Sequence, residues 1–191
     1  MSWILEHYIE ITGAVLGLLF LFFEIRQSAW LWPTGILSSL FYIYIFYAAQ
    51  FYADMGLQVY YVVVSIYGWY YWLKGKREEE DKLPVVRLKA RLAQLLALFT
   101  ILIFVLIAYV LVHFTDSPLP YWDAFTTALS ITATWMLARK ILEQWWLWII
   151  VNLVSLGLYV YKGLYPTVVL FAFYTLMSFV GYRQWKKSAQ L

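Results

Sequence analysis

Several residue types are absent or scarce in this chain of 191 residues. It contains no cysteine, which excludes disulfides, cysteine metal sites and thiol catalysis. Charged residues make up only 13% of the sequence, about half of the roughly 25% that is usual for soluble proteins. The two histidines, His7 and His113, have no partner at ligand spacing, so bis-histidine haem and HExxH zinc sites are excluded. A P-loop is also missing, so ATP-driven transport by this chain alone is not expected.

What remains is apolar and aromatic. Hydrophobic types make up 64% of the chain and aromatic residues 21%. A soluble domain of this size could not bury so much apolar surface, so the composition excludes a soluble enzyme, a disordered chain and a nucleic-acid binder. We therefore expect an integral membrane protein with no catalytic residue, no metal and no cofactor.

The charged residues divide the chain into seven uncharged runs of 13, 27, 19, 24, 15, 18 and 20 residues. A spanning helix needs about 20 residues, and five runs reach or exceed the range of about 17–25. The first run follows Glu10 and the fifth follows Asp123, and both are short. Each can include a terminal charged residue whose charge extends to the interface. The pattern predicts an all-α integral membrane protein with seven transmembrane helices.

Basic residues predict the orientation of these helices. With seven helices, 13 of the 14 basic residues fall on one side of the membrane, and only Lys162 lies opposite. The positive-inside rule makes the basic side cytoplasmic, so we expect the N-terminus outside and the C-terminus inside. The largest basic group lies in a loop at 74–91, which also carries the acidic run from Glu78 to Asp81. We interpret this loop as a solvated cytoplasmic connector that fixes the topology.

The chain matches itself at an offset of 113 residues. The matched pairs are mostly rare residue types: Arg26 with Arg139, Trp32 with Trp145, Tyr52 with Tyr165, Leu57 with Leu170, Tyr61 with Tyr174, Ser65 with Ser178, Gly68 with Gly181, and Trp72 with Trp185. We therefore expect a first three-helix repeat at 1–73, the loop at 74–91, a linking helix at 92–112, and a second repeat with a short cytoplasmic tail at 113–191.

An odd linking helix gives both triplets the same membrane orientation. The predicted architecture is three plus one plus three helices in parallel repeats, a plan found in transporters such as the SWEET carriers. This favours transport. The alternative class is a non-transport membrane scaffold, in which the repeat only builds a stable bundle.

Aromatic and amide side chains at helical spacing indicate a solute site. Trp148 and Asn152 are four residues apart, and Gln58 and Tyr61 are three apart, so each pair shares one helix face. Asn152 also lies near the middle of its run, where an amide is costly unless it has a partner or a ligand. We expect these four residues to hold a flat, partly polar solute between the two triplets.

Further candidates for substrate contact are less specific. They are Trp32, Ser39, Tyr174 and Glu24. Tryptophans near helix ends are also typical of the interfacial belt, and small residues on these faces are typical of close helix packing. Glu24 lies near a helix end, where pairing with Arg26 is an alternative role. The acids Glu24, Asp54, Asp116, Asp123 and Glu143 lie at the ends of the predicted helices or in loops. Facilitated diffusion is therefore favoured over proton or sodium coupling.

Two runs resemble the Pnu family of bacterial vitamin transporters. They are FYADMGLQVYYVVVSIYGWYYW at Phe51–Trp72 and the stretch Trp145–Trp185, which begins WWLWIIVN and ends with GYRQW. The resemblance implies a bacterial inner-membrane protein that takes up nicotinamide riboside or thiamine by facilitated diffusion. It also implies trapping of the solute by a cytoplasmic kinase, a homotrimer, and substrate contacts at Gln58, Trp148 and Asn152.

One stretch departs from the nicotinamide riboside branch. The residues Trp32–Ser39 read WPTGILSS, with serine where that branch has asparagine after the glycine. The WPxGI form is more similar to the thiamine branch. We therefore expect thiamine as the solute, with nicotinamide riboside as the alternative.

Overall fold

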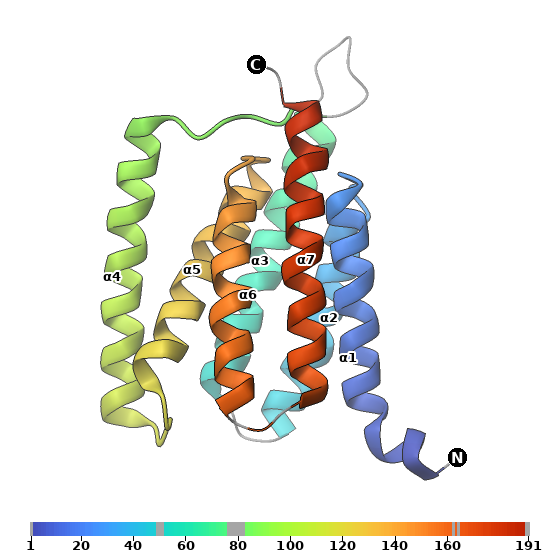
Figure 1. Cartoon of the computed structure of the whole chain (residues 1–191), viewed down its shortest axis with the longest axis vertical. Helices are drawn as coiled ribbons and strands as arrows, with labels where there is room; N and C mark the ends of the chain where they lie inside the picture. The colour runs from blue at the N-terminus through green and yellow to red at the C-terminus, as the bar shows by residue number, and fades with distance from the viewer. Residues whose placement is uncertain (1, 49–51, 76–82, 162, 164, 190–191) are drawn as a thin grey trace. The chain divides into compact units, whose positions relative to one another are not determined.

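The computed structural model describes residues 2–48, 52–75, 83–161, 163 and 165–189, and these form seven α-helices. The helices are α1 (Ser2–Ile25), α2 (Leu31–Ala48), α3 (Tyr52–Lys74), α4 (Ala90–Phe114), α5 (Pro120–Ala138), α6 (Gln144–Tyr161) and α7 (Tyr165–Ser188) (Figure 1). The prediction of an all-α chain with seven helices is confirmed.

The two short apolar runs extend past charged residues, as expected from the sequence. Helix α1 has 24 residues and includes Glu10. Helix α5 has 19 residues and includes Asp123 in its first turn, with Pro120 at its N-terminus. Proline suits this position because the first helical N–H groups have no partner within the helix.

The chain forms two compact units, Met1–Leu83 and Pro84–Leu191. The first contains α1 to α3, and the second contains α4 to α7. The linking helix thus packs with the second helical triplet, and the division of the chain into four parts stays a prediction. The acidic run Glu78–Asp81 of the loop at 74–91 lies outside the described residues.

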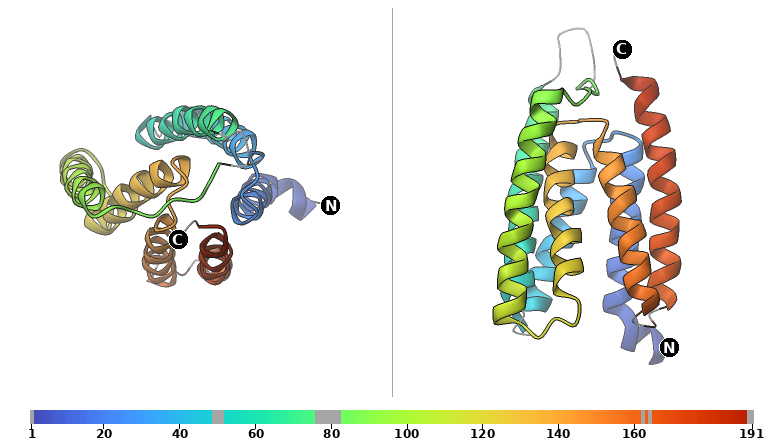
Figure 2. Two further views of the ribbon diagram at one scale, coloured as in Figure 1. Left: turned by 90° about the horizontal axis from the view of Figure 1, so that it is seen from above. Right: turned by 60° about the vertical axis from the view of Figure 1, so that its left-hand side comes forward.

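In the first unit, α2 packs against both α1 and α3 (Figure 2, left). Gly35 on α2 allows this close approach. A Cβ atom placed on Gly35 would lie 3.0 Å from the Phe20 ring of α1 and 3.2 Å from the Ser65 hydroxyl of α3. Small residues at such contacts bring helix backbones together, which maximises van der Waals packing where no water drives association.

In the second unit, α5 lies between α4 and α6, and α6 packs against α7. The α4–α5 contact includes a hydrogen bond of 2.7 Å between the hydroxyls of Thr100 and Thr132. Ala108, Ala124 and Ala128 are buried on the same two helices. The rest of α4 is largely exposed apolar surface, as expected for a helix that faces lipid.

The segment before α4 is bound to the turn between α5 and α6. Val86 donates its N–H to the Lys140 carbonyl at 3.1 Å, and the Leu142 N–H donates to the Val86 carbonyl at 2.9 Å. The Glu143 carboxylate accepts the Leu88 N–H at 2.8 Å and lies 3.8 Å from the Arg87 guanidinium. These bonds fix where α4 begins relative to the rest of its unit.

Helices α1 and α5 end in the same way. Gln27 and Lys140 adopt left-handed backbone conformations, with φ of 53° and 57°. Gln27 N–H bonds to the Glu24 carbonyl and Ser28 N–H to the Phe23 carbonyl, at 3.0 and 2.9 Å. Lys140 and Ile141 make the corresponding bonds in the second unit, both at 2.9 Å. This is the Schellman arrangement, which satisfies helix-terminal carbonyls.

Each of these turns delivers a tryptophan into a buried aromatic pair. Trp32 meets Trp72 edge-on with ring centroids 5.5 Å apart, and Trp145 meets Trp185 in the same geometry at 5.7 Å. All four rings are buried. Edge-to-face pairs of this kind contribute about 0.5–1.5 kcal/mol beyond their buried area. The pairs fix one end of α2 against α3 and of α6 against α7.

Among the described residues, two helices, Ala90–Phe114 and Gln144–Tyr161, are long and apolar enough by composition to cross a membrane. Helix α3 does not meet the same criterion because it is rich in tyrosine and tryptophan, whose polar atoms lower its hydropathy. Tyrosine and tryptophan are nevertheless common in membrane proteins, where they are enriched at both membrane–water interfaces.

Two glycines are required by the tryptophan pairs. A Cβ on Gly68 would lie 2.8 Å from Cε2 of Trp32, and one on Gly181 would lie 2.6 Å from Cζ3 of Trp145. Both distances are shorter than a carbon–carbon contact, so either indole would have to move. We predict that Gly68→Ala and Gly181→Ala each destabilise the protein by about 1–3 kcal/mol through overpacking, measured as a lower midpoint of thermal unfolding in detergent.

Gly56 on α3 and Gly157 on α6 are matched controls, because nothing lies within 4 Å of a Cβ added at either position. Alanine there is expected to be neutral or slightly stabilising, since it favours a helix by up to about 1 kcal/mol over glycine. Equal effects at all four glycines would contradict the packing described for the tryptophan pairs.

Candidate functional site

One face of α6 carries the residues that the sequence singled out. Asn152 is buried, with 7% of its surface exposed, and Trp148 one turn earlier is half-buried. Ser155 is buried and Tyr159 is half-buried further along the helix. The α6 face therefore combines a large aromatic ring, a buried amide and hydroxyl groups within three helical turns.

The Asn152 amide is held by α7. Its Nδ2 donates to the Ser178 hydroxyl at 3.3 Å, and that hydroxyl donates to the Tyr174 carbonyl at 2.8 Å. Among the described residues this is the one side-chain hydrogen bond of Asn152. An amide offers two donor hydrogens and an acceptor oxygen, so the contact with Ser178 uses only part of its capacity.

The indole N–H of Trp148 also has unused capacity. Its Nε1 atom is buried and has no hydrogen-bond partner in the described part of the chain. The same holds for Nε1 of Trp32 and of Trp145, but these two rings are fully enclosed, with 0% exposed. Only Trp148 leaves part of its ring accessible. The accessible part of Trp148 is therefore ring surface and not its N–H group, which is enclosed.

Helix α3 presents a similar pair in the first unit. Gln58 and Tyr61 are both half-buried, and the Tyr61 ring lies 5.6 Å from the Tyr60 ring. The two residues are three apart on one helix, so they are neighbours on its surface. This unit therefore also carries an amide beside an aromatic ring.

The remaining sequence candidates occupy different environments. Trp32 is fully buried in its pair with Trp72, so a solute would reach it only if that pair separated. Ser39 and Glu24 are buried, with exposed fractions of 5% and 4%. Tyr174 is half-buried, and its ring lies 5.6 Å from Phe171. Their roles as substrate contacts stay predictions.

Ser178 is the residue whose role the sequence reasoning missed. A small residue on this helix face is typical of close helix packing, and the structure also makes Ser178 the hydrogen-bond partner of Asn152. Helical spacing places Ser178 four residues after Tyr174, the spacing at which a serine hydroxyl reaches a backbone carbonyl. That spacing was visible in the sequence, but the pairing of α6 with α7 was not.

The chemistry of these groups suits binding. Indole and phenol rings stack on flat rings and attract cations, and the amides accept and donate hydrogen bonds. In each unit these groups lie away from the helix ends. Within a bilayer, water does not compete for hydrogen bonds at such positions.

Comparison with known proteins identifies the family. Residues 7–187 match the model of the nicotinamide mononucleotide transporter family. The nicotinamide riboside transporter PnuC of Escherichia coli is 27% identical, with 96% of this chain and 87% of the relative covered. The riboflavin/roseoflavin transporter RibM of Streptomyces davaonensis is 29% identical, with 92% and 83% covered.

A solved structure agrees with this assignment. The crystal structure of the vitamin B3 transporter PnuC superimposes with a TM-score of 0.78 at 25% sequence identity, with 97% of this chain and 83% of that chain covered. The match confirms the resemblance to the Pnu family and the expectation of a membrane transporter of small vitamins rather than an enzyme. This chain therefore belongs to the nicotinamide mononucleotide transporter family, and this membership implies a multi-pass protein of the inner membrane.

Proposed function

We propose that this protein carries nicotinamide riboside across the inner membrane by facilitated diffusion. The observation that carries the proposal is the buried Asn152 amide one turn from the accessible Trp148 ring on α6. Nicotinamide riboside combines a flat cationic ring, a carboxamide and a ribose. An indole face suits the ring, and an amide suits the polar groups at its edge.

The relatives favour nicotinamide riboside over thiamine. Among them are nicotinamide riboside transporters and a transporter of riboflavin. The serine-containing stretch Trp32–Ser39 pointed to thiamine, and we replace that expectation with the alternative. Riboflavin is the second candidate, because the relative that carries it is 29% identical to this chain and riboflavin also presents a flat heteroaromatic ring.

The proposed contacts follow from residue chemistry. The solute ring stacks on Trp148, and its polar edge meets Asn152. Gln58 and Tyr61 on α3 are further proposed contacts, because they too combine an amide with an aromatic ring. Glu24, Asp54 and Asp123 each lie within one turn of a helix end, which supports a carrier without proton or sodium coupling. Net uptake then depends on a cytoplasmic kinase that phosphorylates the solute and traps it.

We further propose that α1 to α3 and α5 to α7 are parallel copies of one repeat, as in SWEET carriers, with α4 as the link. Four features that recur at the offset of 113 residues support this. They are the left-handed residues Gln27 and Lys140, the buried Trp32 and Trp145, their partners Trp72 and Trp185, and the glycines Gly68 and Gly181. A homotrimer is proposed from the family resemblance alone.

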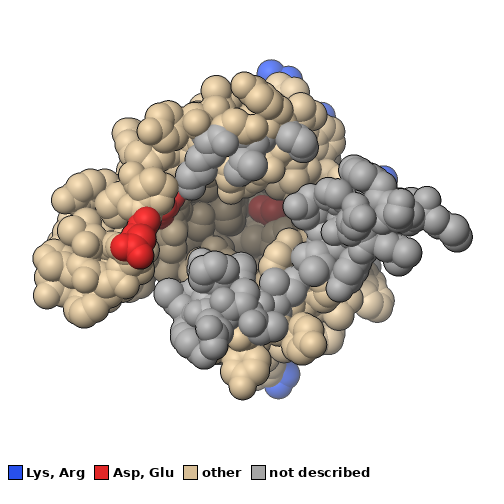
Figure 3. Space-filling model, turned by 90° about the horizontal axis from the view of Figure 1, so that it is seen from below, with Lys and Arg blue, Asp and Glu red and all other residues tan. Residues whose placement is uncertain are grey.

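The orientation proposed is N-terminus outside and C-terminus cytoplasmic. In the second unit, the basic segment before α4 is bound to the α5–α6 turn, and Val85 pairs with Ala189 beyond α7. Basic residues of three chain segments thus gather at one end of this unit. In Figure 3, seen from below, the described residues in view are mostly neither acidic nor basic, with some acidic atoms and with basic atoms only at the edge of the view. Such an asymmetry supports a cytoplasmic basic end.

A reporter fused after Leu191 tests the orientation. A fluorescent protein that matures only in the cytoplasm is expected to be active there, and alkaline phosphatase, which needs an oxidising compartment, is expected to be inactive. Fusions in the 74–91 loop serve as a second cytoplasmic point. The opposite pattern at the C-terminus would contradict the proposed topology.

Uptake into vesicles tests the solute and the mechanism together. Purified protein in vesicles without any kinase is expected to give saturable equilibration of labelled nicotinamide riboside, unchanged by a protonophore because the proposed carrier is not coupled to protons. Unlabelled riboflavin and thiamine serve as competitors. Saturable uptake of thiamine but not nicotinamide riboside would reject the proposed solute, and loss of equilibration with a protonophore would reject the uncoupled mechanism.

Substitutions on α6 test the site. Asn152→Ala removes a buried amide, worth roughly 1–3 kcal/mol, and Trp148→Ala removes a cation–π contact worth about 2 kcal/mol in a dry site. Each is expected to weaken nicotinamide riboside binding by about one order of magnitude or more, as measured by calorimetry on protein that elutes as one species.

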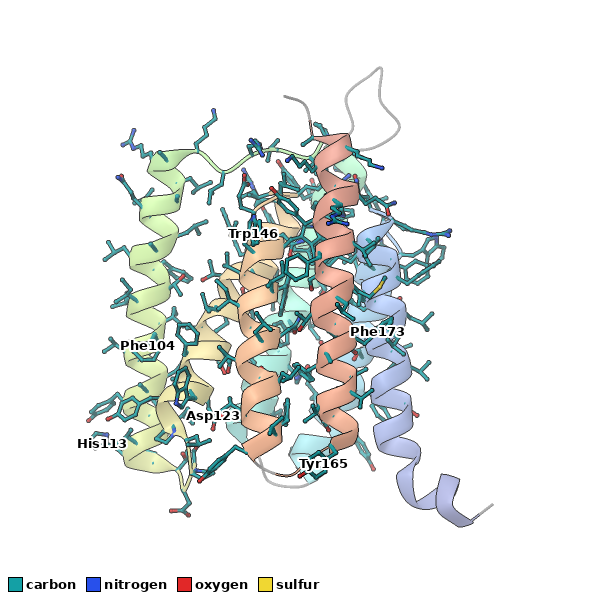
Figure 4. All side chains as sticks on the ribbon, in the orientation of Figure 1. Phe104, His113, Asp123, Trp146, Tyr165 and Phe173 are labelled. Carbon is teal, nitrogen blue, oxygen red and sulfur yellow. The ribbon has the colours of Figure 1, made fainter. Side chains whose placement is uncertain are left out.

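Trp146→Ala is the matched control. Trp146 lies on the same helix, has 45% of its surface exposed, and contacts Phe179 and Tyr182. It lies toward the end of the second unit opposite to Asp123 (Figure 4). Its loss is expected to leave the affinity for nicotinamide riboside within about twofold, since a side chain outside the proposed site contributes little binding energy. Parent-like binding by well-folded Asn152→Ala and Trp148→Ala proteins would place the site elsewhere.

A further inference from the structure

The hydroxyl of Ser178 makes two hydrogen bonds in a nearly water-free environment. Ser178 on α7 has only 2% of its surface exposed. Its oxygen lies 2.8 Å from the Tyr174 carbonyl of the same helix and 3.3 Å from Asn152 Nδ2 on α6. The carbonyl is an acceptor only, so the single hydroxyl hydrogen is used on Tyr174.

This assignment determines which end of the Asn152 amide faces α7. A serine hydroxyl that has already donated its hydrogen can only accept a further hydrogen bond. The group of Asn152 that faces it must therefore be the NH2 group. The reverse orientation would place two acceptor oxygens against each other, at a cost that is large in a low-dielectric interior.

The amide oxygen is consequently turned away from Ser178. Among the described residues, Asn152 has no other side-chain hydrogen bond, so its Oδ1 atom keeps both lone pairs for a ligand. Trp148, one turn earlier on α6, provides the neighbouring ring surface. A solute group that meets this oxygen must bring an N–H or O–H hydrogen, and a carboxylate in the same place would be repelled.

We propose that Ser178 is a positioning residue that sets the specificity of the site. By holding the NH2 group of Asn152, it presents Oδ1 to the solute and selects a ring that carries a neutral carboxamide over the same ring with a carboxylate. This inference rests on the proposed function, in which Asn152 meets the polar edge of the solute ring. It adds the reason why that edge must be a hydrogen-bond donor.

The test compares two nucleosides that differ in one group: nicotinamide riboside, with a carboxamide, and nicotinate riboside, with a carboxylate. The dissociation constant of each is measured by calorimetry for the parent and for Ser178→Ala. Without the hydroxyl, the Asn152 amide is free to turn its NH2 group to the solute. The dissociation constant of nicotinate riboside divided by that of nicotinamide riboside is expected to fall about fivefold to tenfold in Ser178→Ala. The fall is expected mainly because nicotinate riboside binds more tightly to the variant.

Thr175→Val is the matched control. Thr175 lies on the same helix, is buried, and makes the same kind of hydrogen bond, from its hydroxyl to the Phe171 carbonyl at 2.8 Å. Valine removes that hydroxyl with little change in shape, and the parent ratio of dissociation constants is expected to persist. If Ser178→Ala does not fold, Ser178→Cys keeps the volume and supplies only a weak donor and acceptor, so the ratio is expected to fall in the same direction.

The outcomes separate the inference from the proposed function. A parent-like ratio in folded Ser178→Ala or Ser178→Cys, with binding of nicotinamide riboside intact, would overturn the positioning role alone. An equal fall in Thr175→Val would also overturn it, because the effect would then come from helix packing. Failure of the parent to bind either nucleoside would instead overturn the proposed function. A fall confined to the Ser178 variants supports the inference.

Discussion

A polar group inside a bilayer has no water to bind, and this constraint organises the interior of the second unit. Thr126, Ser130 and Thr134 on α5 each donate their hydroxyls to the backbone carbonyl four residues earlier. Thr100 and Thr132 bond to each other across the α4–α5 contact. Hydroxyls can be satisfied in this way by their own helix. An asparagine amide has more donors and acceptors than its surroundings supply, so Asn152 keeps an unused acceptor, which we propose meets the solute.

The rigid part of each unit lies at the ends of its helices. The edge-to-face pairs Trp32–Trp72 and Trp145–Trp185 are fully or almost fully buried. In each pair one indole packs against a glycine, Gly68 or Gly181, which leaves room for the ring. Because the Trp145–Trp185 pair holds one end of α6 against α7, it also sets where Trp148 and Asn152 lie relative to α7. The half-buried state of Trp148, Gln58 and Tyr61 contrasts with these enclosed rings and is what a carrier site requires, because its solute must enter and leave.

Much of this could be predicted from the sequence because membrane solvation acts on composition and spacing. The length of the uncharged runs predicts seven helices, even where α1 and α5 extend past charged residues. The periodicity of Trp148 and Asn152 places them on one face. Contacts between helices could not be derived, because periodicity identifies a face but not its partner. The hydrogen bond from Asn152 to Ser178 and the enclosure of Trp32 and Trp145 are of this kind. The solute is a further point of difference, since the serine in Trp32–Ser39 favours thiamine whereas the relatives favour nicotinamide riboside.

We propose that the α6 face binds the solute through the ring of Trp148 and the oxygen of Asn152. The most direct test is an experimental structure of the protein with nicotinamide riboside bound. In that structure the pyridinium ring is expected to stack on Trp148, with the carboxamide nitrogen within about 3 Å of Asn152 Oδ1 and Asn152 Nδ2 still bonded to Ser178. Nicotinamide riboside bound away from α6, or Asn152 donating its NH2 group to the solute, would contradict it.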